Sequence, residues 1–192
     1  MLMRLAALIT LVFAASIAPA QAGLWSHVSP DSDPQRLQPA TLTDAQIKSF
    51  ARFLRHQKSG SIWDCEGPEL NDLIKGLTFQ TIPSPGVNLV LADAGAGCAR
   101  GGQGANGAMW VIRFKGATPN LLGTPSELSG WIFSIQPTLS HGYPDIITGW
   151  HMGAAEADLN YMRFDGKSYR SIGSAKLISD GGENDKIVPD QP

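Results

Sequence analysis

The chain has 192 residues, with 15 Lys plus Arg against 17 Asp plus Glu and a formal net charge of −2. A chain of this length fits one domain with a real core, and its slight excess of acid argues against nucleic acid as a ligand. The two cysteines are too few for a zinc centre, and no C-x-x-C spacing occurs. The composition therefore indicates a single globular domain that does not bind nucleic acid.

Residues 1–22 have the composition of a secretory signal peptide. Arg4 precedes an apolar run over 5–18, and small residues stand at Ala20 and Ala22. An apolar run of about 14 residues is too short to span a bilayer of about 30 Å. We therefore expect an exported chain, periplasmic or secreted, that begins at Gly23 and has no membrane span in its mature form.

Residues 23–42 contain three prolines among Ser, Asp and Gln. This composition buries too little apolar surface to hold one conformation, so it predicts a flexible linker. Trp25 and its neighbour Leu24 leave open the alternative that the segment docks onto the domain or onto a partner.

Two helices are predicted next. Thr43 and Gln46 form a capping box, and apolar residues follow at helical spacing, which predicts a helix over 43–57. Pro68 is suited to open a second, short helix over 69–75. From residue 77 onward, β-branched residues and turn signals predict antiparallel strands.

Residues 102–107 read GQGANG, which matches G-x-G-x-x-G letter for letter. A dinucleotide site needs those glycines between a strand and the N-terminus of a helix. Residues 108–114 instead alternate and are rich in β formers, so they predict a strand. We therefore expect neither a nucleotide site nor any other cofactor.

An internal repeat explains this part of the chain. The segments WVIRFKG and NYMRFDG, at 110–116 and 160–166, lie fifty residues apart, and both end in Arg-Phe-x-Gly. An apolar strand precedes each segment, at 87–92 and at 145–150. Each meander is too small to bury its own face, so we infer two related units that pack together.

These features predict an α+β fold. N-terminal helices would pack on an antiparallel β-meander sheet of about six or seven strands, with two related units and one disulfide. We expect a single domain over 43–179 and a disordered tail over 180–192.

Cys65 and Cys98 are the only cysteines of the chain. In an exported chain such a pair usually forms a disulfide, and closing a loop of about 34 residues stabilises a fold by about 3–4 kcal/mol. Cys98 lies in a glycine-rich loop over 93–107, which the bridge would hold at one point. We interpret this loop as a binding element in which Arg100 and Gln103 reach a partner; a plain surface insertion is the alternative.

A short part of the second unit, GYPDIITG at 142–149 followed by YMRFDG, resembles the FG-GAP type of β-repeat found in exported and adhesive proteins. In that family a loop of alternating Asp residues binds calcium, and Asp145 matches the last acid. Pro137, Leu139 and His141 stand at the preceding ligand positions and are not carboxylates. The resemblance therefore implies the hairpin without the calcium site, and two units are too few for a propeller.

His141, Asp145, His151 and Glu156 fall around one predicted hairpin. They could form an acid/base pair or a metal site, although no H-E-x-x-H or nucleophile elbow occurs. Surface histidines beside a turn are the simpler interpretation.

The tryptophans sit in or beside predicted strands, so most are expected in the core. Tyr143 and Trp150 would form a binding platform for a sugar ring or a protein hot spot if both faced solvent.

We therefore predict an exported, non-catalytic binding protein of the cell envelope or periplasm, whose partner is another envelope or extracellular protein. In its narrower form the protein is an inhibitor or immunity-type antagonist that acts through the 93–107 loop. The alternative is a periplasmic hydrolase or metal-dependent enzyme that uses the hairpin of His141, Asp145, His151 and Glu156. A structural component of the envelope would need no site at all.

Overall fold

The computed structural model describes residues 23–30, 37–57, 65–94, 97–101, 106–181 and 185–190. The expected signal peptide over 1–22 and Gln103 lie outside these residues. The helical elements are α2 (Asp44–Arg55), α3 (Gly67–Gly76) and the 3-10 turn η1 (Gly97–Ala99). The strands are β1 (Gln38–Pro39), β2 (Thr78–Ile82), β3 (Leu89–Asp93), β4 (Arg100–Gly101), β5 (Asn106–Lys115), β6 (Thr118–Gly123), β7 (Ser129–Ser140), β8 (Tyr143–His151), β9 (Glu156–Phe164), β10 (Tyr169–Ile178) and β11 (Lys186–Pro189).

Both predicted helices are confirmed. The backbone N–H of Gln46 donates to Thr43 Oγ1 at 3.3 Å and that of Thr43 donates to Gln46 Oε1 at 2.9 Å, which completes the capping box of α2. α3 carries Pro68 in its first turn. Phe50 and Leu54 of α2 are fully buried against the sheet.

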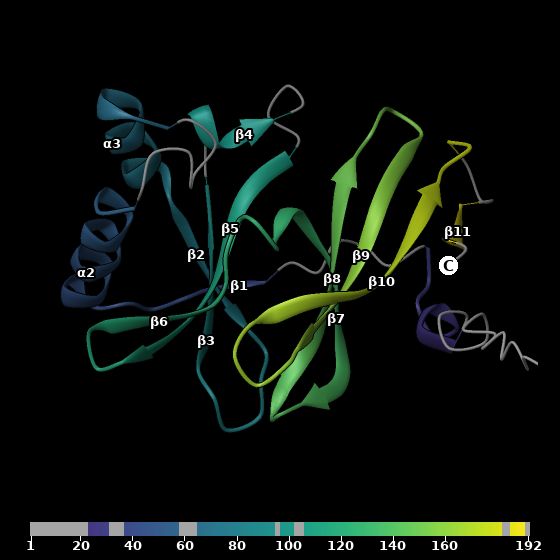
Figure 1. The fold of residues 1–192 in the computed structure, drawn as a ribbon, viewed down its shortest axis with the longest axis horizontal. Coiled ribbons are helices and arrows are strands. Elements are labelled where there is room, and N and C mark those ends of the chain that lie inside the picture. Colours follow the sequence, from purple (N-terminus) through teal and green to yellow (C-terminus); the bar gives the residue numbers. More distant parts are fainter. Residues whose placement is uncertain are drawn as a thin grey trace, which may run out of the picture.

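The predicted antiparallel sheet is also confirmed, with more strands than expected. Among the described residues, eleven strands join in the order β1-β2-β3-β5-β7-β8-β9-β10-β11, and β4 and β6 pair with β5. Gly107 and Ala108 of β5 pair with β7, whereas its later residues pair with β6. β5 therefore joins a first half, β1–β6, to a second half, β7–β11 (Figure 1).

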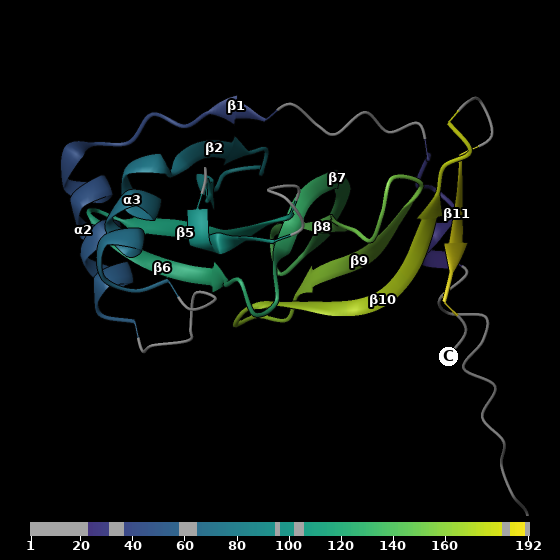
Figure 2. The ribbon, with the colours of Figure 1, turned by 90° about the horizontal axis from the view of Figure 1, so that it is seen from above.

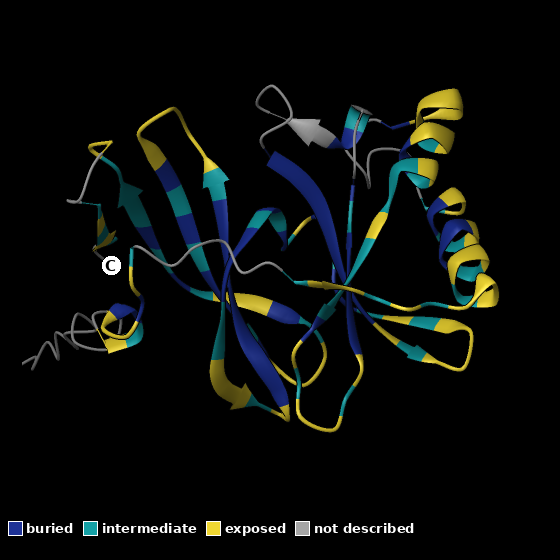
Figure 3. Cartoon of the chain, turned by 180° about the vertical axis from the view of Figure 1, so that it is seen from behind, coloured by how far each residue is buried: buried dark blue, intermediate teal, exposed yellow. Residues whose placement is uncertain are grey.

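The two halves pack face to face, and the helices cover the outer face of the first half (Figures 1 and 2). Side chains on a strand alternate between its two faces. On β3, Leu89 and Leu91 accordingly lie in the core between the halves, while Val90 and Ala92 pack under the helices. Figure 3 shows the buried strands at the centre and exposed residues on the helices and hairpin tips.

The segment expected to be a flexible linker packs on the domain where the structure describes it. Trp25 is 5% exposed and meets Tyr161 edge to face, with ring centroids 5.8 Å apart. Together with Val28, it covers the outer face of the second half, where Phe133 and Leu159 are buried. The apolar partners come from distant strands, so the local composition did not reveal them.

Part of the expected linker and part of the expected tail take part in the sheet. Gln38 and Pro39 form β1 along β2, and four residues of the expected tail form β11 along β10. Residues 191–192 at the end of the tail lie outside the described part of the chain.

The two Arg-Phe-x-Gly segments form hairpins with the same register. Arg113 pairs with Asn120 in the β5–β6 hairpin, and Arg163 pairs with Arg170 in the β9–β10 hairpin. Both partners of the second pair lie fifty residues after those of the first. The spacing of the repeat is thus matched by its hydrogen-bonded register.

Each of these hairpins also contains a register shift at the same place, skipping Leu122 in β6 and Ile172 in β10. The faces correspond as well. Val111 lies between the halves, and its counterpart Tyr161 lies on the outer face of the second half. The two meanders therefore stack in the same orientation, each turning the equivalent face away from the helices.

The start of β7 passes very close to β8. Gly130 has φ +92°, and a Cβ at this position would lie 1.7 Å from the carbonyl oxygen of Gly149. No side chain fits there, because real Cβ atoms do not approach backbone so closely. This close contact fixes the direction in which β7, the first strand of the second half, runs from its pairing with β5.

Gly130→Ala should lower the free energy of unfolding by about 3–5 kcal/mol, because it adds overpacking to the cost of a left-handed Cβ. Gly142→Ala is the matched control, since Gly142 has φ +82° and nothing within 4 Å of its Cβ position. It should cost only about 1–2 kcal/mol. Equal losses in denaturant unfolding would contradict the close approach.

Candidate functional site

The loop at 93–107 is anchored at its first stem. Cys65 and Cys98 form the predicted disulfide, with Cα atoms 5.3 Å apart. The backbone N–H of Ala94 donates to the carbonyl oxygen of Ala108 at 3.0 Å, and Ala99 is fully buried. β4 pairs with the start of β5, so both stems of the loop belong to the sheet. Residues 95–96 and 102–105 lie outside the described part.

Asn106 anchors the second stem to the end of β8. Its Nδ2 donates to the carbonyl oxygen of His151 at 3.0 Å, and the His151 N–H donates to its Oδ1 at 2.8 Å. The Asn106 side chain is buried, and it bonds to β8 as a neighbouring strand would. The stems of the loop are therefore fixed on both the helix side and the β8 side.

An apolar and aromatic surface adjoins these stems. The ring of His151 stacks on Trp131 at 3.9 Å between centroids, and the Trp131 ring lies across Gly149, where a Cβ would be 2.4 Å from it. Met152 is 59% exposed at the tip of the β8–β9 hairpin. We call Trp131, His151 and Met152 the loop-end patch; Trp150 precedes His151 on β8, so its side chain points to the other face of the strand.

The structure places the predicted binding residues at different ends of the molecule. The backbone of Arg100 lies in β4, beside the start of β5. Trp150 is half-buried near the end of β8, whereas Tyr143 is buried at its start, in the core between the halves. The two lie seven positions apart on one strand, a distance of about 23 Å, so they do not share a platform.

The four residues of the enzyme alternative also divide into two groups. His141 and Asp145 lie at the start of β8, and His151 lies at its end. Glu156 forms an ion pair with Lys176 on the neighbouring strand. The structure therefore does not assemble the four.

Asp145 is committed to a buried ion pair. Its side chain is 0% exposed, and Arg163 donates to Oδ2 from Nη2 at 2.7 Å and from Nε at 3.1 Å. Ser140 Oγ donates to Oδ1 at 2.9 Å. Both oxygens of this carboxylate are therefore engaged in hydrogen bonds that join β7, β8 and β9.

Tyr161 and Arg163 extend this polar group across the outer face. Burial raises the pKa of Tyr161, and the Asp145 carboxylate adds to the shift. The bond to Asp145 raises the pKa of Arg163. Arg163 also borders two hollows, of about 440 and 300 Å³, one on each side of it. Residues 23–27 and the irregular part of β7 around Pro137 form the wall of the smaller hollow.

Sequence reasoning missed Arg163 and Asn106 as functional candidates. The sequence showed Arg163 only as part of the repeated Arg-Phe-x-Gly motif. Its pairing with Asp145 depends on the register of β8 and β9. Asn106 was read as part of GQGANG. An acid and a base at equivalent positions of adjacent predicted strands would have been the usable signal.

Within the described ranges, no three His, Cys, Asp or Glu side chains gather closely enough to hold a metal ion. Among the same residues, no helix has the length and apolar character that a membrane span requires.

Replacing both Cys65 and Cys98 with serine should lower the free energy of unfolding by about 3–4 kcal/mol, because the unfolded chain regains the entropy of the closed loop. Denaturant unfolding of the oxidised wild type and of the double variant measures the difference. A loss below 1 kcal/mol would show that the bridge does not hold the loop to the fold.

Asp145→Asn should cost about 2 kcal/mol, because it leaves the Arg163 charge without its partner while solvent still reaches that charge. Asp72→Asn is the control, since Asp72 and Lys75 pair at the surface with side chains 76% and 77% exposed. The control should leave the unfolding midpoint unchanged. Identical midpoints for Asp145→Asn and wild type would refute the role of the buried pair.

Comparison of the chain with family models, with curated proteins and with solved structures finds no match. The function is therefore argued from the geometry of the described residues.

Proposed function

We propose that this chain is an exported, non-catalytic binding protein of the cell envelope or periplasm that recognises another protein at its loop end. The contact surface would combine the loop-end patch with the 93–107 loop. An inhibitor or immunity-type antagonist is the narrower form of the proposal.

The anchoring of the 93–107 loop carries this proposal. The disulfide fixes one stem, and Asn106 fixes the other to the β8 backbone at 2.8 and 3.0 Å. A binding segment held in this way loses less conformational entropy when a partner binds. Anchored stems beside exposed Met152 and the stacked Trp131 therefore suit protein recognition, in which aromatic residues and Met are enriched.

The positions of the candidate catalytic residues favour binding over the enzyme alternative. Arg163 neutralises Asp145, Lys176 pairs with Glu156, and the His151 ring is stacked on Trp131. Each of these groups thus has a structural partner other than the remaining members of the predicted constellation.

We also infer that the two meanders are related units, as the fifty-residue repeat implies. The shared register, the shared register shift and the common stacking orientation support this relation. Blades of a propeller stack in the same sense, face upon face. Here the helices cover one end of a two-unit stack, and the segment around Trp25 covers the other.

Affinity capture tests the binding surface. The mature chain from Gly23 would be immobilised and exposed to envelope extract of the source organism. Met152→Ala and Arg100→Ala should each reduce capture of the specific partner about tenfold or more, the loss expected of a residue central to an interface.

Leu139→Ala is the matched control, because Leu139 is another exposed apolar residue, at 46%, and lies on β7 opposite the start of β8. It should bind the partner as wild type does. Equal capture by all four proteins would refute recognition at the loop end. Loss with Leu139→Ala alone would move the interface to the other end of the sheet.

A further inference from the structure

A cavity of about 440 Å³ lies between the β7–β8 turn and the β9–β10 hairpin. Ser140 and His141 border it from the first turn, and Phe164 and Asp165 from the second. Its volume falls in the range of small-ligand sites. The cavity is at the start of β8, far from the loop-end patch, so its function does not depend on the one proposed above.

Two arginines border this cavity side by side. Arg163 on β9 and Arg170 on β10 are direct partners in the register of the two strands. Side chains in this position have Cβ atoms about 5 Å apart, and like charges there repel each other. Ion pairs with neighbouring acids already compensate part of this repulsion, and an anion placed between the two guanidinium groups would contact both of them.

The acids that already contact these arginines leave donors available. Asp145 is on β8, on the far side of β9 from β10, and Glu127 binds Arg170 Nη1 at 2.9 Å. Asp165 is 3.8 Å from Arg170 Nε, and its Oδ1 accepts two backbone N–H groups of its own turn. The side chains of Arg163 and Arg170 remain 37% and 57% exposed, and each guanidinium has five N–H donors.

The rest of the wall consists of the β7–β8 turn at His141 and of apolar surface. His141 has φ 53°, the only positive value at a non-glycine residue among those described. Its ring lies over Gly166, 3.6 Å from where a Cβ would stand, and meets Phe164 edge to face at 6.3 Å. Positive φ at His141 and at Gly142, where it is 82°, is the geometry that a two-residue hairpin turn between β7 and β8 requires. Phe164 and Ile172 add apolar surface beside the arginines.

We propose that this cavity binds a carboxylate shared between Arg163 and Arg170, with an apolar group against Phe164 and Ile172. Guanidinium groups suit this ligand because their planar donors match the two oxygens of a carboxylate. The buried Asp145 fixes Arg163 in place before the ligand arrives. A small organic acid and the C-terminal end of a protein chain present the same group.

Benzoate is the first probe, titrated into the full mature chain, with benzamide as its uncharged counterpart. Shifts of backbone amide signals from residues 140–142 and 164–172 report binding by nuclear magnetic resonance. Benzoate should shift these signals at millimolar concentration, and benzamide should not. Binding should weaken as salt is raised, because the cavity is open to solvent.

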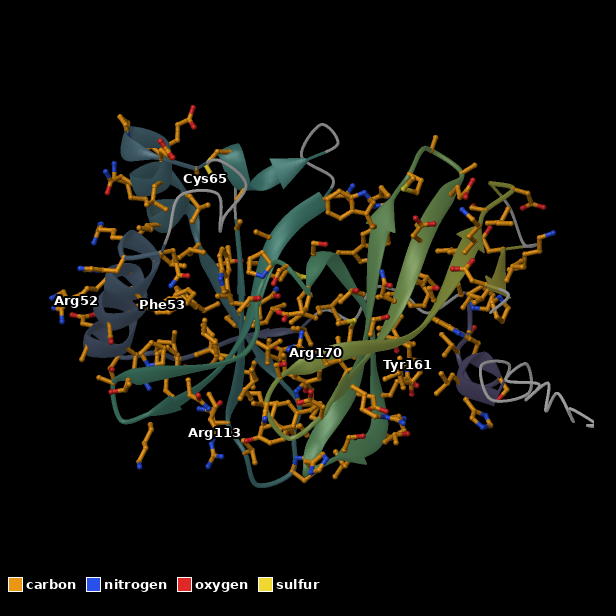
Figure 4. The ribbon with its side chains drawn as sticks, in the orientation of Figure 1. Arg52, Phe53, Cys65, Arg113, Tyr161 and Arg170 are labelled. Atoms are coloured by element: carbon orange, nitrogen blue, oxygen red, sulfur yellow. A yellow bond between two sulfur atoms is a disulfide. The ribbon has the colours of Figure 1, made fainter. Side chains whose placement is uncertain are left out.

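Arg170→Gln should weaken benzoate binding at least tenfold while leaving the Asp145–Arg163 pair intact. Arg113→Gln is the matched control, since Arg113 holds the equivalent place in the first hairpin and donates to the Tyr143 hydroxyl at 3.0 Å. Figure 4 labels Arg113 and Arg170. Arg170→Lys keeps the charge and should bind with intermediate affinity, which covers the case in which Arg170→Gln fails to fold.

Equal binding of benzoate and benzamide, equal affinities of Arg170→Gln and wild type, or benzoate shifts confined to other residues would each overturn the proposal. To distinguish a protein C-terminus from a small organic acid as the ligand, an acetylated peptide that ends in phenylalanine is titrated as the free acid and as the amide. Binding of the acid at least tenfold tighter than benzoate supports a protein C-terminus, and weaker or equal binding supports a small organic acid. Neither result bears on capture at the loop end.

Discussion

The fold depends on one strand, β5, that both halves of the sheet share. Residues 106–112 of this strand are all buried, so alternate side chains must satisfy two different cores. Trp110 and Ile112 pack under the helices, while Met109 and Val111 pack between the halves. A slip of one residue would exchange these two sets of side chains. The register of β5 is therefore fixed from both faces at once, and every other element is placed relative to it.

The transfer of β5 from β6 to β7 also creates the loop end. Within a few residues, β5 changes its pairing partner from β6 to β7. The start of β7 therefore lies against β8, and only a glycine at position 130 fits beside the backbone of Gly149. Asn106 lies at this junction and replaces missing strand pairing with its own amide bonds to His151. The stems of the 93–107 loop, the Trp131 stack and Met152 thus meet at one place because the two halves of the sheet separate there.

Elements with local causes were predictable from the sequence. The capping box at Thr43 predicted α2, and the alternating residues after GQGANG predicted β5. Features that depend on pairing were not predictable. The sequence around Trp25 predicts a linker, because the apolar partners of Trp25 lie far away on β7 and β9. Arg163 is recognisable in the sequence only as part of the repeat, because Asp145, with which it forms an ion pair, lies on β8. Tyr143 and Trp150 are two aromatic residues close together in the sequence, yet the extended strand β8 places them near its opposite ends.

The stacking of the meanders gives the two repeat arginines different surroundings. Arg113 faces the second half of the sheet, and its guanidinium reaches the hydroxyl of Tyr143 there. Arg163, at the equivalent place, faces beyond the last meander, where no third unit follows within the described residues. Asp145 compensates its charge from the neighbouring strand, in the position that Leu89 occupies in the first half. A buried ion pair adds little net stability, but it keeps Arg163 ordered on the outer face of the second half. The same repeat position thus serves packing in the first meander and presents a fixed cation to solvent in the second.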